Sequence, residues 1–284
     1  MKEDVYFWSP PGEPRRAIFV HAHLAVPGSG RVVIFVNPLF DEKRRVQRFQ
    51  AGLARALCAQ GASVYRYDHF GTGDSGGELH EFDCAVSLCD LGSLCAAIRE
   101  VHGGCALEIF GIRFGADLGM RYACSDTALR RLWLLEPLGD GARFLKEQRV
   151  RRQMHRKINR MVADAPAVIV AGREYDDHQG YLVSPAVRAF MEELGAGQPL
   201  PEGKRFCLFR FTRGAPRAAA GALRAALAKS NDVRTEEIGC PEFWATQEPP
   251  DLAELTARVC SAFHSQPGCF TPATASANRA DGSE

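Results

Sequence analysis

The residue types with the clearest chemical meaning lie in a glycine-flanked turn at 111–115. The mainly apolar run 107–110 predicts a buried strand before this turn, and a helix is expected after it. Enzymes that attack a carbonyl carbon from such a strand–turn–helix corner place Ser, Asp or Cys at its middle position. Here the middle residue is Arg113, whose guanidinium stays protonated and only donates hydrogen bonds. The turn therefore predicts a scaffold from which the usual nucleophilic chemistry has been removed or replaced.

The other two members of a Ser-His-Asp triad are also missing from the places where they are expected. The acid would follow the strand predicted at 205–211, where the chain has Thr212 and Arg213. The histidine would follow the last predicted strand, where residues 239–244 contain none. Nucleophile, base and acid must act together. We therefore assign no catalytic residue, and we predict no acyl transfer by the usual route.

Four other side chains have suitable chemistry, but each is expected to have a structural role. Ser75 lies in a turn, where a hydroxyl commonly bonds to the local backbone. Cys124 lies on the helix after the corner and is expected to pack. His69 and His178 have a side-chain type that can act as acid or base near neutral pH, although a hydrogen-bonded structural role is the more common one.

Neither a metal nor a cofactor is predicted. The ten cysteines contain no C-x-x-C pair and no zinc-ligand spacing, so we expect reduced structural thiols. The glycine-rich loop at 71–77 matches neither the dinucleotide fingerprint nor the Walker lysine pattern.

Two roles remain open for Arg113. In the first, its guanidinium joins the N–H groups of Phe114 and of the Leu39–Phe40 turn in a cradle for a carboxylate, phosphate or sulfate. In the second, it pairs with an internal carboxylate, because a partly buried charge must be paired. Glu136, at the end of the adjacent strand, is the expected partner, and the alternatives are Glu242 and Glu248.

The candidate ligand-binding residues come from this corner and from the strand ends expected around it. They are Arg113, Phe114, Asn37, Leu39, Phe40, Glu136, His69 and Trp244.

Alternating strand and helix patterns position these residues and predict an α/β fold with a mostly parallel sheet and helices on both faces. The predicted strands are 4–9, 17–23, 31–36, 63–67, 107–110, 131–137, 205–211 and 234–238. The predicted helices are 41–61, 81–102, 144–161, 215–229 and 250–263. The first two strands are expected to form an antiparallel hairpin.

The alternation stops after residue 140 and resumes near residue 201. We interpret 1–140 and 201–264 as two parts of one core, 141–200 as a cap over the carboxyl ends of the strands, and 265–284 as a disordered tail. The cap begins with a strongly basic helix, which is expected to be a solvated face, with a binding surface for an acidic glycan, an acyl-carrier protein or a membrane face as the alternative.

Composition sets the broad class. The chain has 284 residues, is 46% hydrophobic and carries a formal net charge of +1. There is thus no overall charge that would favour nucleic acid. No apolar run approaches the roughly 20 residues needed to cross a bilayer, and no signal peptide is recognisable. We expect a cytoplasmic protein that does not insert into membranes.

Several motifs carry a resemblance to a known family. In chain order they are Asn37–Glu42, Tyr67–Ser75, Gly111–Ala116, Leu135–Gly141, Gly180–Ala186 and Pro241–Glu248. With them, the chain resembles α/β-hydrolases of the serine aminopeptidase-like group. More narrowly, it is similar to the second type of hydrolase-like proteins associated with the exosortase A system of bacterial exopolysaccharide loci. The resemblance covers about residues 1–263.

The resemblance implies an α/β-hydrolase fold with an inserted cap, and it leaves the activity open. One hypothesis is a non-hydrolytic binding or accessory protein in exopolysaccharide or protein-sorting machinery, with a small anionic ligand or an acyl- or glycan-bearing partner. The other is a non-standard hydrolase or biosynthetic enzyme that acts on an ester, thioester or amide of an anionic substrate held by Arg113.

Overall fold

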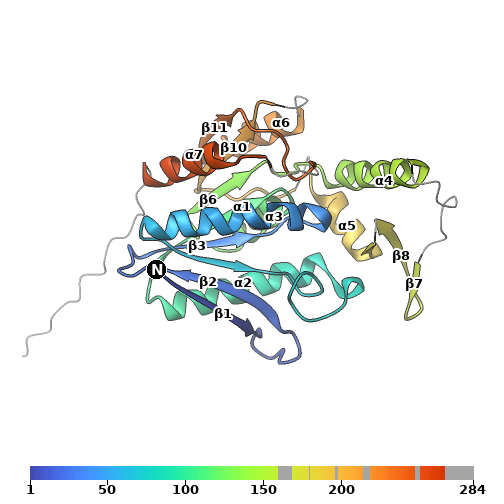
Figure 1. Cartoon of the computed structure of the whole chain (residues 1–284), viewed down its shortest axis with the longest axis horizontal. Helices are drawn as coiled ribbons and strands as arrows, with labels where there is room; N and C mark the ends of the chain where they lie inside the picture. Colours follow the sequence, from blue (N-terminus) through green and yellow to red (C-terminus); the bar gives the residue numbers. More distant parts are fainter. Residues whose placement is uncertain (159–167, 179, 196–197, 214–217, 247–249, 266–284) are drawn as a thin grey trace, which may run out of the picture.

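Eight strands form the central sheet of the protein (Figure 1). The computed structural model describes residues 1–158, 168–178, 180–195, 198–213, 218–246 and 250–265. The sheet order is β1-β2-β4-β3-β5-β6-β10-β11. Its strands are β1 (Lys2–Trp8), β2 (Ile18–Leu24), β3 (Arg31–Val36), β4 (Ser63–Tyr67), β5 (Ala106–Ile112), β6 (Arg131–Leu135), β10 (Arg205–Phe211) and β11 (Asp232–Ile238).

In the sheet, β4, β3, β5, β6, β10 and β11 run parallel, and β2 joins them antiparallel through β4. β1 pairs with β2 as the expected antiparallel hairpin. β3 is buried along its whole length, as expected for a parallel strand with helices on both faces. The carboxyl ends of the parallel strands therefore meet at one edge of the sheet.

Two hydrophobic cores lie on the two faces of the sheet. Val33 and Phe35 of β3 belong to one core, and Val32 and Ile34 belong to the other, because side chains alternate along a strand. The first core holds residues of α1 (Phe40–Ala59) and α7 (Ala253–His264). The second holds residues of α2 (Cys84–Val101), α3 (Phe114–Ala123) and α6 (Ala218–Leu227). The predicted fold class is confirmed.

A separate unit lies between β6 and β10 along the chain. It contains α4 (Gly141–Ile158), a small antiparallel sheet and α5 (Pro185–Glu193). The small sheet is made of β7 (Val168–Val170), β8 (Arg173–His178) and β9 (Tyr181–Val183). This unit lies at the end of the molecule opposite the N-terminus (Figure 1). The exact limits of core and cap stay predictions, and the predicted disordered tail lies almost wholly outside the described residues.

Phe40 connects this unit to the core. Its ring is parallel to those of Phe144 and His178, with centroids 5.8 Å away in both cases, and it contacts Tyr181 at 5.2 Å. Tyr181 also donates a hydrogen bond to Asp41 at 3.4 Å. The start of α1 therefore serves as the contact point between core and inserted unit.

Among the described residues, no helix combines the length and the apolar character needed to cross a membrane.

Candidate functional site

The strand–turn–helix corner forms as the sequence predicts. Arg113 lies between β5 and α3 with φ 54° and ψ −123°, a conformation that costs a non-glycine residue free energy. A Cβ atom at Gly115 would lie 2.1 Å from the carbonyl oxygen of Val36, and one at Gly111 would lie 2.4 Å from Cα of Ala116. Both glycines are therefore required for the close backbone packing that holds this corner.

The side chain of Arg113 is enclosed and paired within the protein. Its Nε lies 3.2 Å from Oε2 of Glu42, and its Nη2 donates to Oε1 of the same carboxylate at 3.4 Å. Nη1 donates to the backbone carbonyl of Glu136 at 3.2 Å. The guanidinium carbon lies 5.0 Å from the ring centroid of Trp244. The two paired side chains are only 4% and 3% exposed, so the internal pair, and not an open cradle, is present.

The prediction that the Glu136 carboxylate pairs with Arg113 was wrong. Glu42 supplies the carboxylate, and Glu136 contributes its backbone oxygen. The Glu136 side chain instead accepts the N–H of Phe211 at 2.6 Å. Glu242 is not the partner either, and Glu248 lies outside the described residues. Glu42 was missed because an acidic residue in the first turn of a helix is also explained by the helix dipole alone.

Asp117 fixes the start of α3 below this corner. It is fully buried, and its carboxylate accepts the N–H groups of Leu138 at 2.8 Å and Gly139 at 3.2 Å. Burial raises the pKa of Asp117 from 3.8 to about 6, while the two N–H groups and the nearby Arg113 act in the opposite direction. The elbow helix is thus tied to the loop that follows β6.

A second polar network lies at the ends of β3 and β4. Asn37 donates to Oδ1 of Asp68 at 3.2 Å, and Lys43 pairs with Oδ2 at 2.7 Å. The backbone N–H of Asp74 donates to the same carboxylate at 2.9 Å. Asp68 therefore joins α1 to the glycine-rich loop, and sequence reasoning had not given it this role.

His69 is buried among aromatic rings. Its ring centroid lies 5.2 Å from that of Tyr67, 6.0 Å from Phe82 and 6.3 Å from Phe114. Its Nε2 lies 3.5 Å from the backbone oxygen of Asn37. Burial lowers the pKa of His69 to about 4, so the imidazole is neutral at pH 7 and a weak base. This environment favours a structural role.

The remaining nucleophile candidates have structural hydrogen bonds. Ser75 donates to the backbone oxygen of Asp68 at 2.7 Å and accepts the N–H of Phe19 at 2.9 Å. Cys124 is exposed and not packed as predicted. Its Sγ lies 3.5 Å from the backbone oxygen of Met120, and partial burial raises the pKa of its thiol. A raised thiol pKa opposes formation of the reactive thiolate.

A cavity of about 570 Å³ opens at the carboxyl ends of the strands, between the start of α1 and the inserted unit. It is lined from three segments: the start of α1 with the residues before it, the segment from Thr72 to Phe82 after β4, and the β8–β9 turn with the start of β9. Apolar and aromatic side chains make up much of the wall, including Phe40, Phe82 and Tyr181. Lys43 and Arg44 add cationic groups, and Asp41 and Asp74 add carboxylates. Ligands of open α/β sheets commonly bind at this carboxyl edge.

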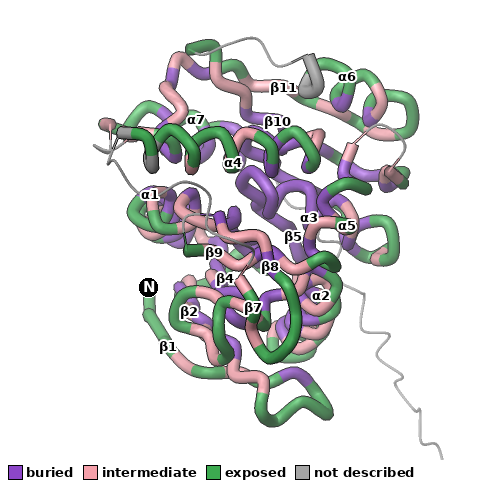
Figure 2. Tube along the Cα trace, turned by 90° about the vertical axis from the view of Figure 1, so that its right-hand side faces the viewer, coloured by how far each residue is buried: buried purple, intermediate pink, exposed green. Residues whose placement is uncertain are grey.

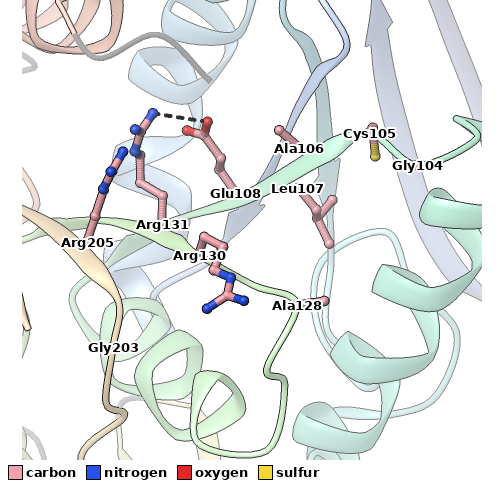
Figure 3. A pocket seen from close by; sticks show the side chains of 10 residues that line it. All are labelled: Gly104, Cys105, Ala106, Leu107, Glu108, Ala128, Arg130, Arg131, Gly203 and Arg205. Carbon is pink, nitrogen blue, oxygen red and sulfur yellow. Dashed lines mark hydrogen bonds and ion pairs between the residues drawn. The ribbon is translucent and has the colours of Figure 1, made fainter. Parts of the chain in front are cut away.

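A second cavity, of about 500 Å³, lies at the opposite edge of the sheet, where β5, β6 and β10 begin. Its wall carries Glu108 of β5 opposite Arg131 of β6, which in turn lies opposite Arg205 of β10 (Figure 3). Arg131 contacts Glu108 at 3.4 Å. This cavity is far from the candidate residues predicted from the sequence.

Carboxylates of the inserted unit neutralise part of the positive charge of helix α4. Arg149 pairs with Asp176 at 2.7 Å, and Arg152 pairs with Asp177 at 3.0 Å, both on β8. Most of the helix surface is exposed (Figure 2). These contacts explain part of the basic run through packing against an acidic strand.

The predicted residues separate into three groups in the structure. Arg113, Glu136 and Trp244 meet at the corner, and Asn37, His69 and Phe114 form a buried set beside it. Leu39 and Phe40 line the carboxyl-edge cavity. Ligand binding by these residues stays a prediction.

Comparison with known proteins gives a consistent picture. The model of the family described as serine aminopeptidase, S33, matches residues 30–192. No curated protein sequence matches the chain significantly.

Solved structures with the same fold have low sequence identity. A putative hydrolase from Agrobacterium vitis S4 superposes with a TM-score of 0.62 at 13% identity, over 93% of this chain and 99% of that one. An esterase from Pyrococcus furiosus gives 0.62 at 13% identity, over 94% and 92%. A serine hydrolase without a lid from Xanthomonas campestris gives 0.56 at 15% identity, over 96% and 98%. At such identities, these likenesses show the fold.

Proposed function

The chain belongs to the serine aminopeptidase S33 family, and from this premise and the contacts of Arg113 we propose that it is a binding or accessory protein without serine-hydrolase turnover. The buried Arg113–Glu42 pair is the observation that carries the proposal. A guanidinium that stays protonated at neutral pH occupies the position from which a nucleophile would attack, and an internal carboxylate neutralises its charge.

Arg113 links three segments around the elbow, one of which is the segment expected to carry the triad histidine. It starts at the elbow, contacts Glu42 in the first turn of α1, and reaches the backbone of Glu136 after β6. It also faces Trp244, in the segment after the last strand where the histidine is expected. The arginine thus stabilises the architecture of an active site while filling its centre.

The carboxyl-edge cavity is the proposed ligand site. Its aromatic and aliphatic wall suits a hydrocarbon chain or a sugar ring, and its cations suit a carboxylate or phosphate on the same molecule. Arg44 is the more available cation, because its side chain is 73% exposed, whereas Lys43 is 19% exposed and pairs closely with Asp68. We therefore propose a small anionic ligand, or the acyl or glycan group of a partner.

The biological setting is the most specific part of the proposal. An accessory role in an exosortase-associated exopolysaccharide or protein-sorting system, in the cytoplasm, depends on the motif resemblance. The fold and the corner are compatible with it.

Labelling with a fluorophosphonate and with iodoacetamide tests the absence of turnover. We expect no stoichiometric adduct on the folded protein and no hydrolysis of p-nitrophenyl acetate above the rate of a heat-denatured sample. Arg113→Ser is also expected to be inactive. Residues 239–246 after the last strand, where the catalytic base is expected, contain no histidine to activate the new serine. A specific adduct on a cavity residue, with matching esterase activity, would support the enzyme hypothesis and reject the proposal.

Calorimetric titration with octanoate and with glucuronate tests the cavity. At least one probe is expected to bind, and Arg44→Ala is expected to weaken it about five-fold, the effect of losing an exposed ion pair worth ~1 kcal/mol. Arg48→Ala is the matched control, since Arg48 is an exposed arginine of α1 that does not line the cavity. Equal effects of the two substitutions would contradict the assignment of the cavity.

A further inference from the structure

A group of two histidines and one glutamate lies on the outer part of the main sheet, away from the elbow. Glu3 of β1 is directly opposite His23 of β2, and His21 lies two residues before His23 on the same face. The candidate ligand atoms of these three side chains all lie within 4.8 Å of one another. From this cluster we propose a binding site for a divalent transition metal ion, with Zn²⁺ as the expected ion.

Two of the three separations between the candidate ligands are near those of a tetrahedral site. His21 Nε2 lies 3.2 Å from Oε2 of Glu3, and His23 Nδ1 lies 3.4 Å from Oε1. Zinc binds histidine nitrogen and carboxylate oxygen at about 2.0–2.2 Å, so that two of its tetrahedral ligands are separated by roughly 3.3–3.6 Å. The two measured separations are close to this range, although each goes to a different oxygen of Glu3. The rings of His21 and His23 are stacked, with centroids 4.3 Å apart and planes 22° apart, so binding an ion requires the histidine rings to rotate while the backbone register is kept.

The burial of His23 is the independent observation that points to a ligand. Its side chain is 0% exposed, its Nε2 has no hydrogen-bond partner among the described residues, and its Nδ1 lies 3.4 Å from Oε1 of Glu3 without forming a hydrogen bond. A buried polar group without a partner costs about 1–3 kcal/mol, and a metal ion would remove that cost at one nitrogen.

The other two residues keep the site accessible. The side chains of His21 and Glu3 are 20% and 33% exposed, which leaves room for water as a further ligand. Two histidines and one carboxylate with an open position are a donor set that zinc uses in proteins. Bound there, the ion would join the edge strand β1 to β2.

Two arginines lie near this cluster, and one of them competes with a metal ion for the carboxylate of Glu3. Arg55 of α1 donates to Oε1 of Glu3 at 2.9 Å, from a side chain that is 54% exposed. Arg66 of β4 is directly opposite His21 in the register. Because Arg55 occupies the oxygen nearest His23, its removal is expected to strengthen metal binding.

Titration of the untagged, chelator-treated protein with Co²⁺, followed by displacement with Zn²⁺, tests the site. We expect one equivalent of Co²⁺ to give the visible absorption of a tetrahedral nitrogen and oxygen site, without the near-ultraviolet band of thiolate ligation. His21→Gln and Glu3→Gln are each expected to weaken binding at least about ten-fold, which is the lower limit for loss of even a supporting residue of a metal site. Arg55→Ala is expected to tighten it.

The control is His264→Gln, which removes an exposed histidine of α7 and should leave the titration unchanged. A second measurement is the melting temperature, which Zn²⁺ should raise in the parent and much less in Glu3→Gln. Absence of binding at one equivalent would overturn the proposal. So would binding that survives both ligand substitutions, or binding with the thiolate band.

Discussion

A buried arginine–glutamate cluster lies at each end of the parallel strands, one at the amino edge and one at the carboxyl edge of the sheet. The two clusters differ in the conformation of the backbone that carries them. At the amino edge, Arg31 and Glu108 lie on regular strands and form two parallel contacts of 3.0 Å, and Trp133 adds a hydrogen bond of 2.6 Å. At the carboxyl edge, Arg113 lies on a strained turn and reaches Glu42 at 3.2–3.4 Å.

The two clusters therefore differ in their role. The amino-edge cluster has the geometry of a pair that stabilises the fold, and the carboxyl-edge cluster keeps the backbone conformation of an active-site corner. The amino-edge cluster has the two-pronged geometry that gives arginine–carboxylate pairs their strength. The carboxyl-edge cluster has longer contacts and keeps the positive φ of a nucleophile position, although no nucleophile is there. Strain of this kind persists only where the surroundings enforce it, here through Gly111 and Gly115.

The largest expected effect compares the two carboxylates directly. Removing one partner of a buried pair costs about 3–5 kcal/mol, because the other charge stays buried. Glu108→Gln should fall at the upper end of this range, since both Arg31 and Arg131 lose their anion. Glu42→Gln should fall at the lower end. Urea titration measures both, and a larger loss for Glu42→Gln would reverse the comparison.

A smaller effect concerns Asp117, which supports the carboxyl-edge corner. Its folded pKa of about 6 lies above the reference value of 3.8. Its contribution to stability is therefore fully present below about pH 4 and is lost as the pH rises through about 6. Relative to Asp117→Asn, the parent should gain on the order of 1–3 kcal/mol between pH 7 and pH 4.

The check is the difference in free energy of unfolding between parent and Asp117→Asn at several pH values. Taking a difference removes the contribution of the other carboxylates. A difference that does not change between pH 4 and pH 7 would show that Asp117 is not the buried acid described here.

The smallest effect is expected on the exposed surface of the inserted unit. Arg143 and Glu147 of α4 pair at 2.9 Å with side chains 58% and 40% exposed. Arg143→Met should change the free energy of unfolding by no more than about 0.5 kcal/mol. A loss of unfolding free energy comparable to that of Glu42→Gln would mean that burial does not explain why the Arg113–Glu42 pair matters more than this exposed pair.

The sequence was sufficient for features that depend on local pattern. The β-branched run 31–36 and the corner around Arg113 lie where they were expected, because apolar periodicity and glycine spacing are local signals. The strands of the inserted unit were not predicted, since β7 and β9 have only three residues each and show no period.

Features that depend on tertiary packing could not be predicted. The partner of Arg113 is 71 positions away in sequence, and only the packing of α1 against the elbow brings Glu42 there. The histidine cluster needed the register that places Glu3 opposite His23. No metal site was predicted from the sequence, because the register that brings the three residues together is not visible there.

The central claim is that Arg113 is committed to an internal carboxylate. A double-mutant cycle with Arg113→Met, Glu42→Met and the double variant tests it most directly. Each single substitution should cost about 3–5 kcal/mol, and the double variant should regain enough stability to give a coupling energy of at least ~2 kcal/mol. Effects that add within about 0.5 kcal/mol would contradict the claim and would leave Arg113 available to bind a ligand.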